Sequence, residues 1–386
     1  MKRHSALAIF VLAVCWPLGV GAITPDKPEF RKLAEDVYAY IGKLNDANAL
    51  VIVTSQGVVV VDTGNSPVET RNLQKHIQAV TQQPVRYVIL TQNHADHIGG
   101  TPLFSPPASV IAHDRVAKAW AQWKPNVVQA WRKFFPERTA ALQNFHPLDN
   151  VMTFTDHMTL RLGGKTIELI YVDDPYNAGD VAVWLPESRV LHGSMAAYKE
   201  RHPDIRPDYS HGTTAGLLKF LEAMIPLQPK FVIQAHGPIG DTKDLHAMVD
   251  YLLIARQRVR GMMDRGMSEP AIRELFHMNE YREWDRAALH LPVMAAAIHR
   301  ELQGLGPEII VAPEKQLRGR ITKVVDEGRF LTVASESGEE IALRVGGLVD
   351  IEGVPNRTQF KVGMRLRALY EQQKEWNETL EIRVEP

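Results

Sequence analysis

Residues 91–100 read Thr-Gln-Asn-His-Ala-Asp-His-Ile-Gly-Gly, and the segment Val85–Thr91 that leads into them is short, apolar and rich in β-branched side chains. Such a segment predicts a buried strand. A tight loop at its end, which Gly99-Gly100 permits, can aim side chains into one cavity. Two imidazoles and a carboxylate placed this closely suit Zn²⁺, and with open coordination positions they also suit Fe²⁺ or Mn²⁺. The stretch therefore predicts a metal site at the end of a strand.

This stretch resembles the metal-binding signature of the metallo-β-lactamase superfamily, T-H-x-H-x-D-H-x-G-G. The strand 57–61 ends in Asp62-Thr63-Gly64, as the opening hairpins of that superfamily do. The resemblance gives Asp62 a supporting role, in which it orients the metal loop without binding the metal. Residues 235–238, Ala-His-Gly-Pro, match a late G-H-G-P element and make His236 a candidate ligand. The resemblance implies an α/β fold, the αββα sandwich, and a metal-dependent hydrolase.

The match to the family's ligands is incomplete. The family's two-metal site combines three histidines with a second set of aspartate, histidine and histidine, usually with a bridging aspartate. On this chain the resemblance leaves the second set intact, as Asp96, His97 and His236. The first set and the bridge are altered: His94 is retained, Gln92 stands at the first histidine position, Tyr176 at the third, and the bridge falls near Ser194-Met195.

These replacements favour a single dominant metal. A glutamine carbonyl is a weak, neutral oxygen donor to zinc, and a tyrosine must first lose a proton with a pKa near 10. The second set keeps three good ligands with room for water, which is the plan of a catalytic zinc site. We therefore expect about one Zn²⁺ per chain, with Fe²⁺ or Mn²⁺ as alternatives. The candidate metal residues are Asp96, His97, His236, His94 and Gln92.

The expected chemistry is hydrolysis of a small-molecule ester, lactone, lactam, thioester, or sulfate or phosphate ester. Zinc lowers the pKa of its bound water to about 7. Asp96 would orient the resulting hydroxide and accept a proton. His94 and Tyr176 would hydrogen-bond the developing oxyanion or the leaving group. The resemblance thus makes Asp96, His94 and Tyr176 the candidate catalytic residues.

Several other polar residues have no settled role at this stage. Asp173, Asp174, His192 and His202 are considered as replacement ligands for the altered first set. Three cations follow the Ser194 strand, Lys199, Arg201 and Arg206, and the sequence does not identify which of them, if any, clamps an anionic substrate.

Two other functions stay open beside the zinc hydrolase. Two histidines and one carboxylate with open positions are also the plan of a mononuclear iron oxygenase. The loss of two ligands and of the bridging aspartate is also expected of a catalytically silent binding protein whose metal site has decayed. The fold alone does not exclude such a binding protein.

The chain begins like an exported protein. Lys2 and Arg3 precede the apolar segment Ala6–Val14, and Val20-Gly21-Ala22 resembles a cleavage site, so residues 1–22 are predicted to be a signal peptide. The apolar segment is too short for a stable membrane span. A periplasmic or secreted location follows, with lipid attachment at Cys15 as the alternative. Removal of this segment leaves 42 of the 44 basic residues against 45 acidic ones, a net charge of −3 without a basic stripe, so nucleic acid is not an expected partner.

The remaining chain is long enough for two domains. Residues 23–303 are predicted to form the metallo-β-lactamase-like domain, with a helical extension at about 241–303. A glycine- and proline-containing linker, 304–315, precedes a small all-β domain, 316–386, whose short strands suggest a barrel of the OB type. The aromatic helical stretch Asp114–Phe145 is expected to be core or a lid over the site. Other expected elements are strands at Val37–Gly42, Ala49–Val53, Gly57–Val61, Ser109–Ala112, within Val151–Met195, at Lys230–Gln234, Gly319–Val325, Phe330–Ser335, Glu340–Val345, Met364–Tyr370 and Thr379–Val384, and helices at Pro67–Val80, 212–225, 241–259 and 265–303.

Overall fold

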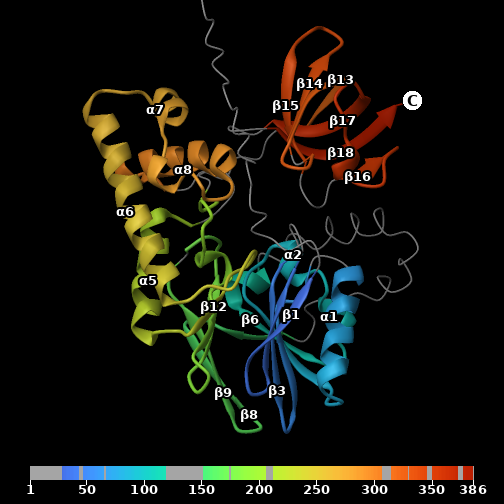
Figure 1. Cartoon of the computed structure of the whole chain (residues 1–386), viewed down its shortest axis with the longest axis vertical. Helices are drawn as coiled ribbons and strands as arrows, with labels where there is room; N and C mark the ends of the chain where they lie inside the picture. Colours follow the sequence, from blue (N-terminus) through green and yellow to red (C-terminus); the bar gives the residue numbers. More distant parts are fainter. Residues whose placement is uncertain are drawn as a thin grey trace, which may run out of the picture.

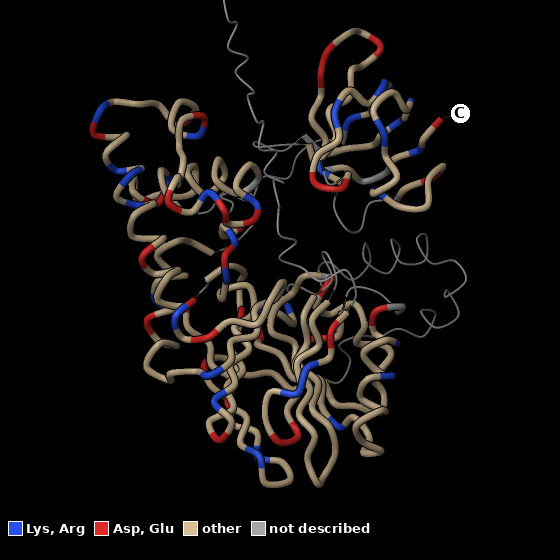
Figure 2. The backbone as a smooth tube through the Cα atoms, viewed as in Figure 1, with Lys and Arg blue, Asp and Glu red and all other residues tan. Residues whose placement is uncertain are grey.

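The structure is a computed structural model that describes residues 28–42, 47–64, 67–118, 151–173, 175–205, 212–306, 314–328, 330–345, 350–372 and 377–385. The predicted signal peptide and most of the aromatic stretch Asp114–Phe145 lie outside these residues. Within them, no helix combines the length and the apolar character needed to cross a bilayer. Acidic and basic residues lie interspersed along the backbone (Figure 2).

Two sheets form the centre of the larger part of the molecule (Figure 1). The first has seven strands in the order β1-β2-β3-β4-β5-β6-β7, antiparallel from β1 to β4 and parallel from β4 to β7. The second has five strands in the order β12-β11-β10-β9-β8. The strand bounds are β1 Glu29–Ala34, β2 Val37–Ile41, β3 Ala49–Thr54, β4 Gly57–Val61, β5 Val85–Leu90, β6 Ser109–His113, β7 Val151–Phe154, β8 His157–Leu162, β9 Lys165–Tyr171, β10 Val181–Leu185, β11 Val190–His192 and β12 Phe231–Ile233.

The two sheets pack face to face over a shared apolar core. Ile52 and Ile89 of the first sheet belong to one buried cluster with Leu169 and Val183 of the second. Alternate residues on these strands point the other way, as the period of a strand requires, and each outer face receives its own helices. Strands β4 and β5 carry apolar residues on both faces, because one face packs against the second sheet and the other against helices.

Helices cover both outer faces, which confirms the predicted αββα sandwich. On the first sheet, α1 (Pro67–Val80) contributes Leu73 and Ile77 to a cluster with Val88 of β5. On the second sheet, α5 (Thr214–Met224) and α6 (Thr242–Asp264) pack against β10 and β11, with Phe220 of α5 in the same cluster as Trp184. The predicted helix at Pro67–Val80 has these same bounds.

The helical extension contains a break that the sequence pattern did not predict. Instead of one helical stretch over 265–303, α7 (Glu269–Leu275) and α8 (Ala287–Leu302) are separated by a loop. Trp284 in that loop stacks on Tyr251 of α6, with ring centroids 5.0 Å apart. The apolar residues of 265–303 are therefore buried by two separate helices and an aromatic loop, which pack on α6.

The C-terminal strands form a closed barrel with one additional strand. The order β15-β14-β13-β17-β18, together with a parallel pairing of β15 with β18, closes the ring in the arrangement of an OB-type barrel. This confirms the expected small all-β unit. Strand β13 begins at Glu314, within the predicted linker, and the three-residue β16 was not predicted. The bounds are β13 Glu314–Val325, β14 Phe330–Ser335, β15 Glu340–Arg344, β16 Asp350–Glu352, β17 Arg365–Gln372 and β18 Asn377–Glu385.

Candidate metal centre

The strand order brings the predicted site residues to one edge of the sandwich. Asp62 follows β4, the motif loop follows β5, and His236 comes shortly after β12. Since β4 and β5 are parallel neighbours, their carboxyl ends lie side by side. Asp96 and His97 belong to a single helical turn, α2 (Ala95–Ile98), rather than to an irregular loop. These segments of distant sequence therefore converge through ordinary α/β topology.

Three predicted ligands form one group. The donor atoms of Asp96, His97 and His236 all lie within 4.8 Å of one another. His236 Nε2 is 3.0 Å from Asp96 Oδ2, and His97 Nε2 is 3.6 Å from the same oxygen. Within the described chain this is the one group of three such side chains close enough to hold a metal ion.

Asp62 determines how His97 is oriented. Its Oδ2 lies 2.7 Å from His97 Nδ1 and accepts a hydrogen bond of 2.8 Å from the Thr91 hydroxyl, while its Oδ1 accepts one of 2.9 Å from the Thr91 backbone N–H. Both Asp62 and His97 are fully buried. When the carboxylate accepts a hydrogen bond from Nδ1–H, the lone pair of Nε2 is available to bind a metal.

One buried nitrogen at this centre, His97 Nε2, is available to bind a metal ion. His97 Nε2 is buried and, among the described residues, has no hydrogen-bond partner. A buried polar atom without a partner costs about 1–3 kcal/mol, which a metal ligand bond would recover. Two imidazole nitrogens and one carboxylate oxygen are also the donor set that zinc takes in catalytic sites. The residues present therefore fit Zn²⁺.

The negative charge of Asp96 and the neighbouring imidazoles shift one another's pKa values. Burial alone would raise the pKa of Asp96, but the imidazoles of His97 and His236 hold that pKa well below its usual range. Burial lowers the pKa of His97, and Asp96 and Asp62 more than reverse this, so it lies above its ordinary value. Burial also lowers the pKa of His236, and here its hydrogen bond to Asp96 does not compensate. Asp96 is consequently an anion throughout the neutral range.

Gly100 explains part of the motif. A side chain there would place its first carbon 2.0 Å from the Thr70 hydroxyl and 2.2 Å from the backbone oxygen of Thr63. Gly100 N–H also donates to the Thr63 hydroxyl at 3.1 Å. The motif loop is thus pressed against the turn that carries Asp62, and only glycine leaves room for this contact.

The Asn177 side chain contacts two residues of the altered first set, Gln92 and His94. Asn177 Nδ2 donates to Gln92 Oε1 at 3.0 Å and lies 3.2 Å from His94 Nε2. Gln92 and Asn177 are buried, at 0% and 2% exposure. Neither His94 nor Gln92 belongs to the group of three ligands. Asn177 was not among the residues predicted from the sequence, although it lies next to Tyr176 in the turn that departs from the family pattern.

Tyr176 is buried beside His94. Its ring meets the His94 ring edge-on, with centroids 5.4 Å apart, and its hydroxyl donates to Asp204 Oδ2 at a long 3.5 Å. Its role as a donor to an oxyanion stays a prediction. Asp204 was not named from the sequence, since nothing in its local pattern signals that it lies near the motif.

The described residues among the proposed replacement ligands do not belong to the group of three. His192 is buried, its Nε2 is 3.9 Å from Asp62 Oδ2, and burial lowers its pKa to about 4. His202 Nδ1 is 2.7 Å from the Tyr251 hydroxyl, and Asp173 pairs with Lys219 at 2.7 Å. Asp174 is outside the described residues. Ser194, near the position of the bridging aspartate, is fully buried and contributes a hydroxyl rather than a carboxylate.

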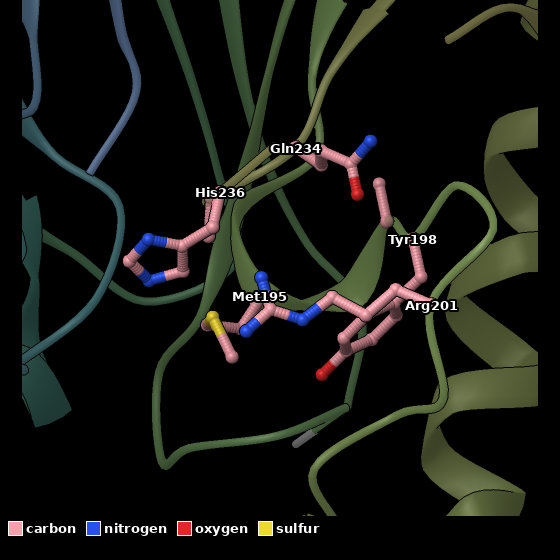
Figure 3. A pocket seen from close by; sticks show the side chains of 7 residues that line it. Met195, Tyr198, Arg201, Gln234 and His236 are labelled. Carbon is pink, nitrogen blue, oxygen red and sulfur yellow. The ribbon is translucent and has the colours of Figure 1, made fainter. Parts of the chain in front are cut away.

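A small cavity opens beside His236 (Figure 3). The space inside it that a water-sized sphere can occupy is about 10 Å³. Its walls come from the 3-10 helix Ser194–Ala196, from the loop after that helix, and from the segment that follows β12. The lining residues are Met195, Ala197, Tyr198, Arg201, Gln234, Ala235 and His236.

Comparison with known proteins agrees with this architecture. The Metallo-beta-lactamase superfamily model matches residues 42–236, about half of the chain. The chain therefore belongs to the metallo-β-lactamase superfamily. The matched range contains Asp62, Asp96, His97 and His236, and it ends before the helical extension and the barrel.

Individual relatives are distant. The chain is 24% identical to a metallo-β-lactamase type 2 of Bacillus sp. (strain 170) over 214 residues, 55% of this chain and 74% of that protein. It is 26% identical to the 2,4-dinitroanisole O-demethylase subunit alpha of Nocardioides sp. (strain JS1661), over 42% of this chain and 44% of that one. A solved inverting sec-alkylsulfatase from Pseudomonas sp. aligns with a TM-score of 0.55 at 15% identity, over 72% of this chain and 50% of its own. This last likeness concerns the fold alone.

Proposed function

We propose that the protein is a periplasmic metal-dependent hydrolase with one dominant zinc ion held by Asp96, His97 and His236. The observation that carries this proposal is the assembled group of three ligands, in which the buried His97 Nε2 has no partner in the described chain and Asp62 fixes the other ring nitrogen. Membership of a superfamily of metal-dependent hydrolases supports the reaction class. The signal peptide predicted from the sequence of residues 1–22 supports the location.

The first-set residues support the single metal. Gln92 and His94 are both engaged by the Asn177 amide, at 3.0 and 3.2 Å. A second metal ion would need to break these contacts and would gain only one imidazole and one weak amide oxygen in return. The group of Asp96, His97 and His236 offers a metal ion two imidazoles and a carboxylate, and the Asn177 amide does not bind these donors.

The chemistry then follows from the chain's own groups. Zinc, when bound, supplies a Lewis acid that lowers the pKa of water from 15.7 to about 7. Asp96 stays ionised, so one carboxylate oxygen can accept a proton from the attacking water. Asp62 holds His97 in one ring orientation. With the Asn177 amide donating to Nε2, neutral His94 carries its proton on Nδ1, and that N–H is the donor it offers to an oxyanion.

The bond cleaved is that of an ester, lactone, lactam or related small molecule. The relatives named above include proteins described as β-lactamases and as part of an O-demethylase, so the superfamily resemblance does not select one substrate. A catalytically silent binding protein is the second candidate. The Gln92–Asn177–His94 contacts favour it, because a dismantled first site is what loss of catalysis would leave.

Elemental analysis of the purified mature protein tests the proposal. We expect about one zinc per chain after reconstitution, because three protein ligands suffice for a catalytic site. The His236→Ala variant should lose the zinc and the hydrolysis of 4-nitrophenyl acetate together. His246→Ala, at an exposed position of α6, is the matched control and should keep both. Iron in place of zinc would favour an oxygenase, and no metal in a correctly folded protein would favour the binding protein.

A further inference from the structure

We propose that the outer surface of the C-terminal barrel binds an acidic oligosaccharide, a sugar chain that carries carboxylate or sulfate groups. This site is separate from the metal centre and does not depend on the proposed hydrolase activity. The barrel has an open cavity in which water-sized spheres can occupy about 220 Å³. Three arginines line it, Arg318 and Arg320 from β13 and Arg365 from β17. They come from strands that are distant in the sequence, so no run of basic residues marks the site there.

The strand register places arginines directly opposite one another. Across β13 and β17, Arg320 faces Arg365 and Arg318 faces Arg367. On the other side of β17, Arg367 also faces Arg383 of β18. All of these side chains are exposed, and basic segments lie on neighbouring strands of the barrel in Figure 2. Like charges directly opposite one another destabilise a sheet, so a bound anion would relieve this repulsion.

Carboxylates neutralise only part of this positive charge. The carboxylates that pair with these arginines include Glu336, Glu352 and Glu385. Glu385 is shared, since it lies 3.1 Å from Arg318 and 2.6 Å from Arg367. Within the described chain, no carboxylate lies in ion-pair distance of Arg320, whose guanidinium donates to the backbone oxygen of Gly363. A backbone oxygen has no net charge, so Arg320 keeps its positive charge for a ligand.

The other groups of the wall match the hydroxyl groups of a sugar. Glu336 and Glu385 line the cavity beside the arginines. An ionised carboxylate has about four acceptor positions, so each can accept from a sugar hydroxyl while it stays paired with Arg318. The guanidinium groups match the oxygens of an acidic group. A densely anionic ligand would be repelled by the two carboxylates, and a neutral sugar would not use the positive charge. An acidic oligosaccharide satisfies both kinds of group.

Two other anionic partners fit the cavity less well. Proteins that bind single-stranded nucleic acid stack its bases on aromatic side chains, and among the described residues no aromatic side chain lines this cavity. Binding to a lipid surface uses large apolar side chains that enter the membrane. The apolar side chain in this wall is that of Ala334, which faces Arg320 across the strands and is too short for that role. Its small size instead leaves room for a ligand beside Arg320.

The spacing of the arginines favours a chain over a single sugar. Arg318 and Arg320 are two positions apart on β13, which separates their Cα atoms by about 7 Å. Arg320 and Arg365 lie on neighbouring strands, which are about 5 Å apart. A ligand reaches several of these groups at once only if it carries more than one acidic group. A chain of acidic sugar units does so, whereas a single sulfate ion does not.

Isothermal titration calorimetry with the full mature protein tests this site. The probes are tetragalacturonate, in which every sugar unit carries a carboxylate, a chondroitin sulfate tetrasaccharide, which carries sulfate as well, and the neutral maltotetraose. We expect an acidic chain to bind, more weakly as the salt concentration rises, and maltotetraose not to bind. The acidic chain that binds more tightly identifies the acidic group.

Arg320→Gln and Arg365→Gln should each weaken this binding by about tenfold or more, because each removes a charge-assisted hydrogen bond. The matched control is Arg282→Gln, which removes the same charge from an exposed arginine outside the barrel that pairs with the adjacent Glu283 at 3.1 Å. R282Q should bind the acidic chain as the wild type does. Far-ultraviolet circular dichroism establishes that each variant is folded, and two separate variants guard against the loss of one.

The opposite results are equally clear. The proposal is overturned if neither acidic chain binds, or if R282Q weakens binding as much as R320Q and R365Q do. It is also overturned if a thymidine dodecanucleotide or phosphatidylglycerol vesicles bind as tightly as the acidic chains, because the surface then recognises another class of partner. Hydrolysis plays no part in these measurements, so their outcome is the same whether or not the metal centre is active.

Discussion

At the scale of single residues, the centre depends on which nitrogen of His97 faces the ligand group. Asp62 settles this by holding Nδ1 at 2.7 Å, and Thr91 in turn holds Asp62 through its hydroxyl and its backbone N–H. Neither Asp62 nor Thr91 belongs to the group of three ligands. Their contribution to metal binding is therefore indirect, through the ring orientation and the basicity of His97.

We expect Asp62→Asn to weaken zinc binding by about 10- to 100-fold, because a neutral amide orients the imidazole less strongly than a carboxylate. Competition with a chromophoric chelator measures the zinc affinity. Thr91→Val is the matched control, since it removes only the hydroxyl contact of 2.8 Å to Asp62 and should have the smaller effect. A D62N protein that binds zinc as tightly as the wild type would contradict the orienting role.

The sequence identified Asp96, His97 and His236 because their residue types and local patterns match a known motif, and the structure places them together. It did not identify Asn177. That residue's importance lies in contacts with Gln92 and His94, which are 85 and 83 positions away, and no local pattern encodes a pairing over that distance. Arg201 could be named only as one of three cations, since the sequence alone does not say which side chain lines a cavity.

At the scale of elements, the helical extension encloses two histidines. His290 on α8 places Nδ1 2.5 Å from the backbone oxygen of His202, and His202 Nδ1 is 2.7 Å from the hydroxyl of Tyr251 on α6. Burial lowers the pKa of His290 to about 3 and that of His202 to about 4. Periodicity predicted helices here but not the break between α7 and α8, because the aromatic loop satisfies the same apolar spacing by packing on α6.

These lowered pKa values predict acid sensitivity. An unfolded histidine has a pKa of about 6.5, so between about pH 6.5 and 4 the unfolded chain binds protons that the folded chain does not. Stability is fully present above pH 6.5 and falls as the pH decreases, by up to about 1.4 kcal/mol per pH unit for each histidine. His290→Gln removes one titrating group and should flatten this slope by up to that amount, as measured by urea unfolding at stepped pH.

The matched control for this pH dependence is His246→Gln, at an exposed position of α6. It should keep the wild-type slope. If H290Q and H246Q lose stability with falling pH as steeply as the wild type, the buried histidine at 290 is not a source of the acid sensitivity.

At the scale of the whole molecule, the barrel has a core of its own. Leu331, Val333, Leu366 and Ile382 belong to a cluster that contains no residue of the sandwich. One contact between the sandwich side and the barrel is the ion pair of Arg286 with Asp326. The barrel itself could be expected from its strand pattern, whereas β16 is too short to leave a signal, and the contact at Arg286 joins distant parts of the chain.

This separation predicts that the metal centre does not need the barrel. A mature protein that ends at Gly306 keeps every described residue of the ligand group, of Asp62 and of the Arg201 cavity. We expect it to bind zinc within about twofold of the full chain, because the barrel has its own core and contributes no residue to the ligand group. Asp326→Asn in the full chain is the control, since it disrupts the ion pair while the barrel stays present. If the truncated protein loses its zinc although D326N retains it, the barrel supports the centre through more than this ion pair.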